Sequence, residues 1–508
     1  MKNGLDRYNK KNNPEGGKRM KKIEINPMTR LEGHGKITIF LDEQGNVENA
    51  FMQVVEFMGY EKFLIGMPIE EVPRTVTTIC GVCRGVHFTA SVKAADGVYG
   101  VEPTPTAKKI RELFLNAHYV EDHTGILYAL GFPDFVCGPT ASPAERNLIG
   151  LILKVGADVG KLVLKKRFSA VRIFEITGGR TSHPVTALPG GWAKRITEEE
   201  RQEILKCADD CVELAKLTLD VFDKVVLQNK DYMALVTGDV YKVVTNYIAT
   251  VDENDKVTYY DGTQKIVDTK GNEIGRFKGI QYLDYIAERT LPWSYQKAPY
   301  LKKIGWTGLV DGDGTSIYSV GPLPRFNVAS GFDTPLAQEA YEKMVAAFGG
   351  KPVHNTLAYH WARAIELMHA AEKLKQIASD ESITDPNVRQ ELGTPVGEGV
   401  GIIEAVRGVL IHHYKTDDKG IVTDANIVVA TTQNKGPMNV AVKRAAENFI
   451  KNGKVDEGIL NLVEIAYRPY DLCFACSTHT LPGRIPVRID IIDHNGELVK
   501  SLRNFEIA

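Results

Sequence analysis

Apolar and polar residues follow a helical pattern in some parts of the chain and alternate in others. The helical pattern, in which apolar residues recur on one face, covers residues 60–67, 84–98, 105–130, 143–170, 196–228, 336–380 and 437–451. Alternation, which is typical of strands, covers residues 22–56, 245–325, 398–432 and 483–502. The turn motifs EQGN and HNG predict that the first and last of these alternating segments are β-hairpins.

Together these patterns predict an α+β chain with a central bundle of long helices and peripheral β-rich lobes. The run at 143–170 is apolar on more than one face, so we expect it to be buried. Residues from about 245 to 325 are predicted to form a β-rich insertion. We divide the chain into a flexible, polar tail (1–22), a body (23–479) and a C-terminal segment (480–508).

Composition excludes several classes of protein. The formal net charge is only -2, so the overall charge does not indicate binding to nucleic acid or to an anionic membrane. No apolar run of about 18 residues is present, so no membrane-spanning helix is expected. The N-terminus is polar and basic and lacks the apolar core of a secretory signal. Seven cysteines are an odd, low number for this length, which favours a reducing compartment and a cytoplasmic location.

Four of the cysteines form two Cys-x-x-Cys pairs near opposite ends of the chain. TTICGVCRGVH contains Cys80 and Cys83, and YDLCFACSTH contains Cys473 and Cys476. Four thiolates can hold zinc, an iron–sulfur cluster or nickel. A structural zinc site and two unrelated redox or buried pairs are the alternatives. Zinc ribbons usually join pairs about 15–20 residues apart, however, and these pairs are separated by nearly the whole chain. The other cysteines, Cys137, Cys207 and Cys211, are expected to be buried apolar residues.

Further motifs occur in order between and around the pairs. They are INPMTRLEGH (25–34), EFMGYEKFL (56–64), GGRTSHPVTALPGG (178–191), EAVRGVLIHHY (404–414) and VATTQN (429–434). With the two cysteine pairs, these strings closely resemble the large, catalytic subunit of nickel–iron hydrogenases, from about residue 22 to the C-terminus. The resemblance is closest to the cytoplasmic group linked to NAD, to F420 or to heterodisulfide reduction. Three residues depart from the family pattern: Thr78, Val406 and Leu472.

The resemblance implies a role for each cysteine of the two pairs. Cys80 and Cys473 would be terminal nickel ligands, and Cys83 and Cys476 would bridge nickel to an iron that carries carbon monoxide and cyanide ligands. Soft, strongly donating thiolates suit nickel. The implied reaction is the reversible heterolytic cleavage of H2 to protons and electrons.

Proton handling would fall to residues near the cysteines. The Cys473 thiolate is favoured as the base, because an arginine such as Arg407 is effectively always protonated. Arg407 would instead lie over the open metal position, held by Asp122 and Asp471. Glu32 would receive the proton next, since a partly desolvated carboxyl can have its pKa raised toward neutrality.

A second, structural ion is also implied. Glu61, His479 and the backbone carbonyl of Ile427 would bind Mg²⁺ or Fe²⁺. His87, which follows the first pair, is expected to hydrogen-bond a bridging sulfur and so tune the metals.

Electrons need a route out of the chain, because it has no further cysteine cluster for iron–sulfur clusters. The resemblance therefore implies an iron–sulfur small subunit, and further electron-transfer subunits carrying flavin and NAD, F420 or a heterodisulfide reductase. For residues 480–508 it implies a maturation propeptide that a protease removes by cutting after His479, the alternative being a hydrogenase that keeps this segment. The alternatives are a complex I-like subunit of the same fold without the metals and a zinc-stabilised structural protein, which metal analysis would separate.

Overall fold

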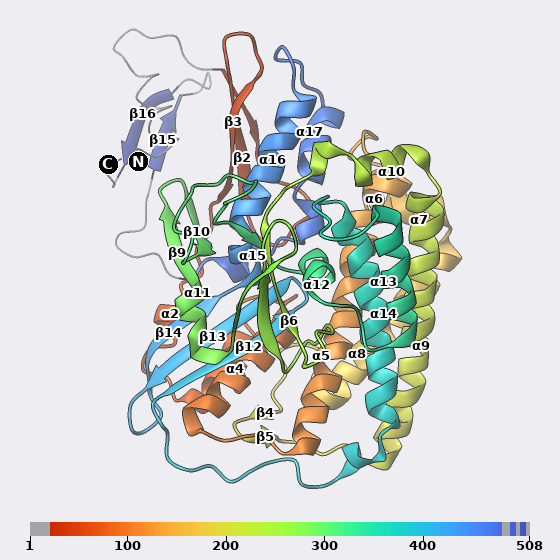
Figure 1. Ribbon diagram of the computed structural model, residues 1–508, viewed down its shortest axis with the longest axis vertical. Coiled ribbons are helices and arrows are strands. Elements are labelled where there is room, and N and C mark those ends of the chain that lie inside the picture. The colour runs from red at the N-terminus through yellow and green to blue at the C-terminus, as the bar shows by residue number, and fades with distance from the viewer. Residues whose placement is uncertain (1–20, 480–487, 494–497, 504–508) are drawn as a thin grey trace.

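The computed structural model describes residues 21–479, 488–493 and 498–503. Its long helices stand together on one side and its sheets lie on the other (Figure 1). Each of the four longest helices packs against two of the others, and these helices are α5 (Pro105–Ile126), α8 (Ala157–Gly178), α9 (Glu198–Phe222) and α14 (Ala358–Ser379). The predicted combination of a helical bundle with β-rich lobes is confirmed.

Three sheets carry most of the strands. The first contains β1 (Lys22–Ile25), β2 (Gly35–Leu41) and β3 (Val47–Val54), so the predicted hairpin at 22–56 has one additional strand. The second contains β12 (Glu398–Ala405), β13 (Gly408–Thr416) and β14 (Val422–Val428). The third, in the order β11-β6-β7-β8, lies in the predicted insertion and comprises β6 (Asn246–Val251), β7 (Thr263–Val267), β8 (Glu273–Phe277) and β11 (Tyr318–Ser319).

Shorter elements complete the described chain. Two-stranded pairs are β4 (Ala187–Leu188) with β5 (Gly191–Trp192), β9 (Ile286–Leu291) with β10 (Ser294–Leu301), and β15 (Arg488–Ile492) with β16 (Leu498–Arg503). The last pair confirms the predicted C-terminal hairpin. The remaining helices are α2 (Tyr60–Phe63), α3 (Val72–Val76), α4 (Arg84–Tyr99), α6 (Phe132–Val136), α7 (Leu148–Val155), α10 (Lys230–Thr237), α11 (Tyr282–Tyr285), α12 (Pro322–Val328), α13 (Pro335–Phe348), α15 (Ala430–Gln433), α16 (Lys435–Phe449) and α17 (Glu457–Ile465).

Glycines let α4 lie directly on β12. A Cβ atom on Gly399 would come 2.1 Å from the Ala94 carbonyl oxygen, and one on Gly401 would come 2.1 Å from that of Ala90. No side chain fits in these positions, so the helix and strand meet backbone to backbone. This close packing fixes the N-terminus of α4, where the first cysteine pair lies.

Several sequence-based expectations need correction. The run at 143–170 is not buried as a whole: it forms α7 and the first part of α8, and Leu153 is 79% exposed. The helix predicted at 60–67 ends at Phe63, and α17 was not predicted. No described helix is long and apolar enough to span a bilayer.

Candidate metal centre

The four cysteines of the two pairs meet inside the protein. All four are buried, and their Sγ atoms lie within 4.8 Å of one another. Cys473 Sγ is 3.4 Å from Cys80 Sγ and 3.5 Å from Cys83 Sγ. The convergence of sulfur atoms from the two ends of the chain, which the sequence predicted, is therefore present in the fold.

Each pair is held by a short structural element. Cys83 is the N-cap residue of α4, and Cys80 lies in the loop between α3 and α4. The second pair is aligned by a parallel bridge between Glu32 and Cys473, in which the Glu32 amide donates to the Leu472 carbonyl at 3.1 Å and the Phe474 amide donates to the Glu32 carbonyl at 2.9 Å.

Gly33 makes this bridge possible. Its φ of 89° lies in the left-handed region, which favours glycine. A Cβ atom there would also come 2.0 Å from Glu56 Oε1 and 2.9 Å from Phe474 Cβ. The glycine of the RLEGH motif is therefore required both for backbone conformation and for the approach of the second cysteine pair.

Electrostatics favour a cation among the four sulfur atoms. Burial and the neighbouring thiols raise the pKa of Cys473 well above its ordinary value, and burial does the same for Cys476. Hydrogen bonds from the three other thiols lower the pKa of Cys80 instead. Four thiolates cannot share this buried volume without a compensating charge, and a bound metal would deprotonate them. The residues present thus fit a site for soft metals.

Arg407 contacts this cluster from the tight turn between β12 and β13. It donates to Cys83 Sγ at 2.9 Å and, from a second guanidinium nitrogen, to Asp471 Oδ1 at 2.9 Å. Asp122 Oδ1 lies 3.6 Å from the same guanidinium. Although burial opposes the charge, Asp471 and Cys83 keep the pKa of Arg407 well above its ordinary value. These contacts favour the charged guanidinium, and the position of Arg407 over an open metal site stays a prediction.

The pKa values of the two aspartates near Arg407, Asp122 and Asp471, are shifted in opposite directions. Burial favours the neutral acid at both, but Arg407 and His123 lower the pKa of Asp122. Burial dominates at Asp471, and its pKa is raised despite its contact with Arg407. Only Asp471 makes a hydrogen bond to the guanidinium, so it holds Arg407 more directly than Asp122 does.

Glu32 contacts Cys473 directly. Its Oε2 atom lies 2.9 Å from Cys473 Sγ and accepts a hydrogen bond from the Ala475 amide at 3.3 Å. Burial and the negative charge of Cys80 raise the pKa of Glu32, and the hydrogen bond to Cys473 opposes this. A carboxyl in this position can exchange a proton with the sulfur atom without moving.

Glu61 and His479 are both buried near the second pair. Both ring nitrogens of His479 lack a hydrogen-bond partner among the described residues. Burial lowers the pKa of His479 to about 4, so its imidazole is neutral and free to bind a metal. Glu61 Oε1 accepts a hydrogen bond from the Ile427 amide at 2.7 Å. Glu61 is near enough to His479 to influence its pKa, so a neutral imidazole and a carboxylate are available for a cation. The site formed by Glu61, His479 and the Ile427 carbonyl stays a prediction.

His87 makes a hydrogen bond that the sequence did not predict. Its Nδ1 atom lies 3.0 Å from Nε2 of His412, a residue of β13. Burial lowers the pKa of His87 to about 3, so the ring is neutral. The expected hydrogen bond from His87 to a bridging sulfur is not among the described contacts and stays a prediction.

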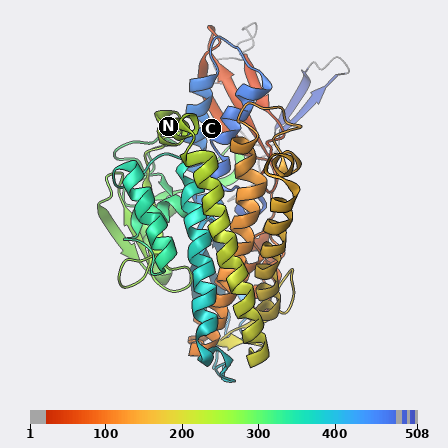
Figure 2. The ribbon, with the colours of Figure 1, turned by 90° about the vertical axis from the view of Figure 1, so that its right-hand side faces the viewer.

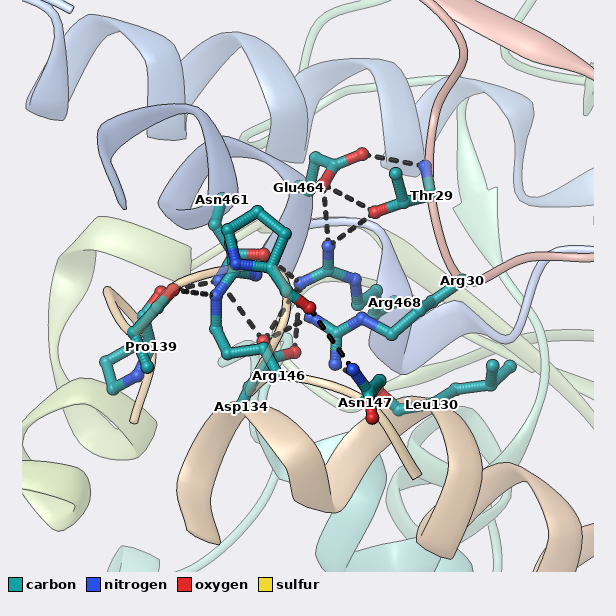
Figure 3. Close-up of polar contacts among 12 residues, drawn as sticks. Thr29, Arg30, Leu130, Asp134, Pro139, Arg146, Asn147, Asn461, Glu464 and Arg468 are labelled. Carbon is teal, nitrogen blue, oxygen red and sulfur yellow. Dashed lines mark hydrogen bonds and ion pairs between the residues drawn. The ribbon is translucent and has the colours of Figure 1, made fainter. Parts of the chain in front are cut away.

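A buried ionic network holds the segments that carry Glu32 and Cys473 (Figure 3). Asp134 on α6 lies 2.5 Å from a guanidinium nitrogen of Arg30 and 3.0 Å from one of Arg468. Arg468 also pairs with Glu464 at 2.7 Å, and Glu464 accepts a hydrogen bond from the Thr29 amide at 2.8 Å. Arg30 precedes Glu32 by two positions and Arg468 precedes Cys473 by five, so the network sets the relative position of the acid and the thiol.

Replacing Asp134 with alanine is expected to destabilise the protein by about 3 kcal/mol, because it leaves the buried Arg468 and the partly buried Arg30 without their shared carboxylate. Burial raises the pKa of Asp134, but Arg468 and Arg30 together lower it below its ordinary value. The carboxylate therefore stabilises the fold above the unfolded-state pKa of about 4, and this contribution is lost as the pH falls through the lower folded-state value.

The measurement is the unfolding midpoint of the wild type and the variant at pH 7 and below pH 4. The difference in midpoint should shrink on acidification. Glu253→Ala, which removes an exposed acid in the turn after β6, serves as the control and should leave the midpoint unchanged. Equal midpoints for Asp134→Ala and the wild type would contradict the role assigned to this network.

Several of these residues carry little signal in the sequence. Asp134 and Arg468 belong to none of the quoted motifs and are 334 positions apart, whereas His412 lies in the EAVRGVLIHHY string without a role assigned to it there. The one available signal is the position of Arg468 in the RPYDLC string ahead of the second pair.

Known proteins resemble this chain over nearly its full length. Residues 58–149 and 208–479 match a family model described as nickel-dependent hydrogenase, and residues 22–57 match one described as HoxL-like. The chain is 64% identical to an F420-non-reducing hydrogenase iron-sulfur subunit from Archaeoglobus profundus, over 96% of this chain and 100% of that protein. It is 36% identical to the NAD-reducing hydrogenase HoxS subunit beta of Cupriavidus necator, over 94% of this chain and 99% of that protein.

A solved structure has a similar fold. The structure described as NAD+-reducing [NiFe]-hydrogenase in the H2-reduced state superposes with a TM-score of 0.83. It is 33% identical in sequence and covers 90% of this chain and 99% of its own. The residues matched by the two family models include both cysteine pairs and Glu32.

Proposed function

The chain belongs to the nickel-dependent hydrogenase family, as a large subunit whose four-cysteine cluster fits a nickel–iron site, and from this we propose that it catalyses the reversible heterolytic cleavage of H2. The contact that carries this proposal is the one between Cys473 Sγ and Glu32 Oε2, at 2.9 Å. It joins a metal-binding sulfur to a carboxyl with a raised pKa. A metal site with only a structural role would not need a proton acceptor next to its sulfur ligand.

We assign the cysteines as the family resemblance implies. Cys80 and Cys473 would hold nickel, and Cys83 and Cys476 would hold both nickel and an iron with carbon monoxide and cyanide ligands. When bound, this centre would supply the Lewis acidity that polarises H2. The protein's contribution is to exclude water from the buried cluster and to fix the four donors.

The proton leaves through residues of this chain. The Cys473 thiolate accepts it, and Glu32 receives it next across their direct contact. Arg407 stays charged throughout, held by Asp471 and facing Asp122, and stabilises negative charge on the sulfur atoms. Glu61, His479 and the Ile427 carbonyl would hold Mg²⁺ or Fe²⁺ as a structural ion.

Electrons leave through partner subunits. The three cysteines outside the cluster, Cys137, Cys207 and Cys211, cannot bind an iron–sulfur cluster of the four-cysteine type. We therefore expect an iron–sulfur small subunit, and beyond it a module for NAD, F420 or heterodisulfide, in a cytoplasmic complex. The relatives are themselves named as subunits of hydrogenases.

Metal analysis of the anaerobically purified complex tests this function. We expect about one nickel per chain, accompanied by iron, and H2-dependent reduction of a viologen dye. Zinc without nickel would support the structural alternative. Neither metal, with no H2 oxidation, would support the complex I-like alternative.

The C-terminal segment gives a separate prediction. If a maturation protease cuts after His479, the intact mass of the chain from active enzyme should be lower by the 29 residues at 480–508. The bond after His479 borders residues outside the described part of the chain, so the proposal rests on the family resemblance. Active enzyme that retains the full mass would exclude cleavage.

A further inference from the structure

The guanidinium of Arg325 on α12 is fully buried and uses all of its N–H groups inside the protein. Its Nε and Nη2 atoms donate to the two carboxylate oxygens of Glu366 on α14, at 2.5 and 2.6 Å. Its Nη1 atom donates to Glu404 at 2.6 Å and to the Ala405 carbonyl at 3.1 Å. Nη2 also donates to the Val406 carbonyl at 3.3 Å. Because the donors of arginine form a rigid, planar fork, these contacts fix the orientation of the guanidinium.

Two of these contacts hold the backbone immediately before Arg407. Ala405 is the last residue of β12, and Val406 and Arg407 form the tight turn into β13, which begins at Gly408. A guanidinium bonded to the carbonyls of Ala405 and Val406 restrains the two peptide planes that lead into Arg407. The direction in which the Arg407 side chain leaves the backbone therefore depends on Arg325.

The start of α12 also touches this turn through its backbone. A Cβ atom on Gly321, which precedes α12, would come 2.9 Å from the Arg407 carbonyl oxygen. One on Gly408 would come 2.7 Å from the Gly321 amide nitrogen and 2.5 Å from a side-chain atom of Val320. No side chain fits at either position, so the two segments meet directly. The Arg325 amide donates to the Gly321 carbonyl at 2.9 Å, which places the guanidinium and this backbone contact on one helical turn.

Glu366 links Arg325 to Arg407 by a second route. Its Oε2 atom lies 3.1 Å from Nε2 of His123, and Nδ1 of His123 lies 3.9 Å from Asp122. Asp122 in turn lies 3.6 Å from the Arg407 guanidinium. Helix α14, which carries Glu366, packs beside α9 and α5 among the long helices (Figure 2). The helical bundle is therefore the support on which Arg325 is fixed.

Arg325 reaches the metal centre only through Arg407. No described hydrogen bond or ion pair joins Arg325 to a cysteine, whereas Arg407 donates to Cys83 Sγ at 2.9 Å. Resting on the proposed function, we propose that Arg325 is a positioning residue, which clamps the β12–β13 turn so that the charge of Arg407 faces the sulfur atoms. A displacement of about 1 Å at a reacting centre can lower a rate by about 10²-fold, so such a clamp matters for catalysis.

Arg325→Lys in the full-length chain and its native complex tests this role. The variant keeps one positive charge between Glu366 and Glu404, but an ammonium has fewer donors and no fork, so it cannot also hold both carbonyls. We expect nickel per chain to match the wild type and H2-dependent dye reduction to fall by about 10- to 100-fold.

Arg111→Lys is the matched control. Arg111 on α5 is equally buried, pairs with the carboxylate of Asp96 and donates to two backbone carbonyls, those of Leu188 and Gly191. None of these partners belongs to the β12–β13 turn. This variant should lower the unfolding midpoint as Arg325→Lys does, but it should leave the rate of H2 oxidation unchanged. An equal loss of rate in both variants would mean that Arg325 acts only through stability, and would overturn the proposal.

A double-mutant cycle with Arg407→Lys tests whether Arg325 acts through Arg407. Residues that act as a unit have non-additive effects. Arg325→Lys should therefore cause little further loss of rate in a chain that already carries Arg407→Lys. The same fold-loss in both backgrounds would show that the two arginines act independently, which contradicts the proposal.

Amide hydrogen exchange gives a readout that does not depend on the reaction. In the same preparations, the amides of residues 405–408 should exchange about tenfold faster in Arg325→Lys than in the wild type or in Arg111→Lys, because the turn has lost its clamp. Exchange as slow as in the wild type would overturn the proposal. Wild-type enzyme without nickel or H2 oxidation would instead reject the proposed function, whatever the exchange at the turn.

A neutral variant serves if Arg325→Lys does not fold. Arg325→Met with Glu366→Gln and Glu404→Gln removes the cation together with both carboxylates, and replacing buried ion pairs by neutral residues of similar size is often tolerated. The rate and the exchange at 405–408 should change as they do for Arg325→Lys. If neither variant folds while Arg111→Lys does, Arg325 is required for folding itself and the proposed positioning role is rejected.

Discussion

Replacing Cys476 with serine is expected to remove nickel and iron from the chain and to abolish H2 oxidation. Cys476 is buried in the cluster and is proposed as a bridging ligand, and a hydroxyl is a much weaker donor to soft metals than a thiolate. Changing residues that only support metal ligands lowers metal affinity or activity by about 10- to 100-fold, so loss of a ligand should have a larger effect. The measurement is nickel and iron per chain, together with H2-dependent dye reduction.

Cys211→Ala is the matched control for this prediction. Cys211 is also buried, but it lies on α9 away from the cluster, and burial raises the pKa of its thiol. This variant should keep both metals and most of the activity. A Cys476→Ser enzyme that still contained nickel and consumed H2 would show that the four-cysteine site is not the catalytic centre.

Replacing Glu32 with glutamine should slow H2 oxidation by about 10²- to 10⁴-fold while leaving the metals in place. The amide keeps the size of the side chain but cannot accept the proton from Cys473. Because Glu32 is not proposed as a ligand, nickel content should match the wild type. Metal analysis and dye reduction on the same preparation therefore distinguish a blocked proton path from a lost cofactor.

Two further variants sharpen the Glu32 prediction. Glu32→Asp retains a carboxyl on a shorter side chain and should recover part of the activity. Glu56→Gln removes a carboxyl that contacts His34 at the surface and should have little effect on the rate. If Glu32→Gln oxidised H2 at the wild-type rate, the proton would have to leave Cys473 by another route.

Local pattern was sufficient for most elements and for the cysteine pairs. Helical spacing predicted α9 closely, because this helix buries one face along its length. β13 and α5 also lie within segments predicted as strand and helix, although almost all of their residues are buried. The same reasoning failed at α7 and α8, where apolar residues on several faces indicated burial. The hydrophobic pattern shows that a helix has apolar surface, but it does not show whether another part of the same chain buries that surface.

The site could be predicted only as far as its motifs extend. Cys80, Cys83, Cys473 and Cys476 were recognisable by their spacing, and Glu32 and Arg407 by the strings around them. Asp134 had no such signal, because its partners Arg30 and Arg468 come from distant segments. Ionic networks of this kind depend on side chains meeting in space and leave no periodic trace in the sequence.

The sequence by itself determined which chemical groups the protein offers. They are four thiolates in two pairs, a carboxyl that can be neutral or ionised, and a guanidinium that stays charged. The tertiary structure alone decided that these groups share one buried volume, with Glu32 against Cys473 and Arg407 against Cys83. Residue type fixes chemistry, whereas distance and burial fix protonation and reactivity. Those two quantities arise only when segments from opposite ends of the chain pack together.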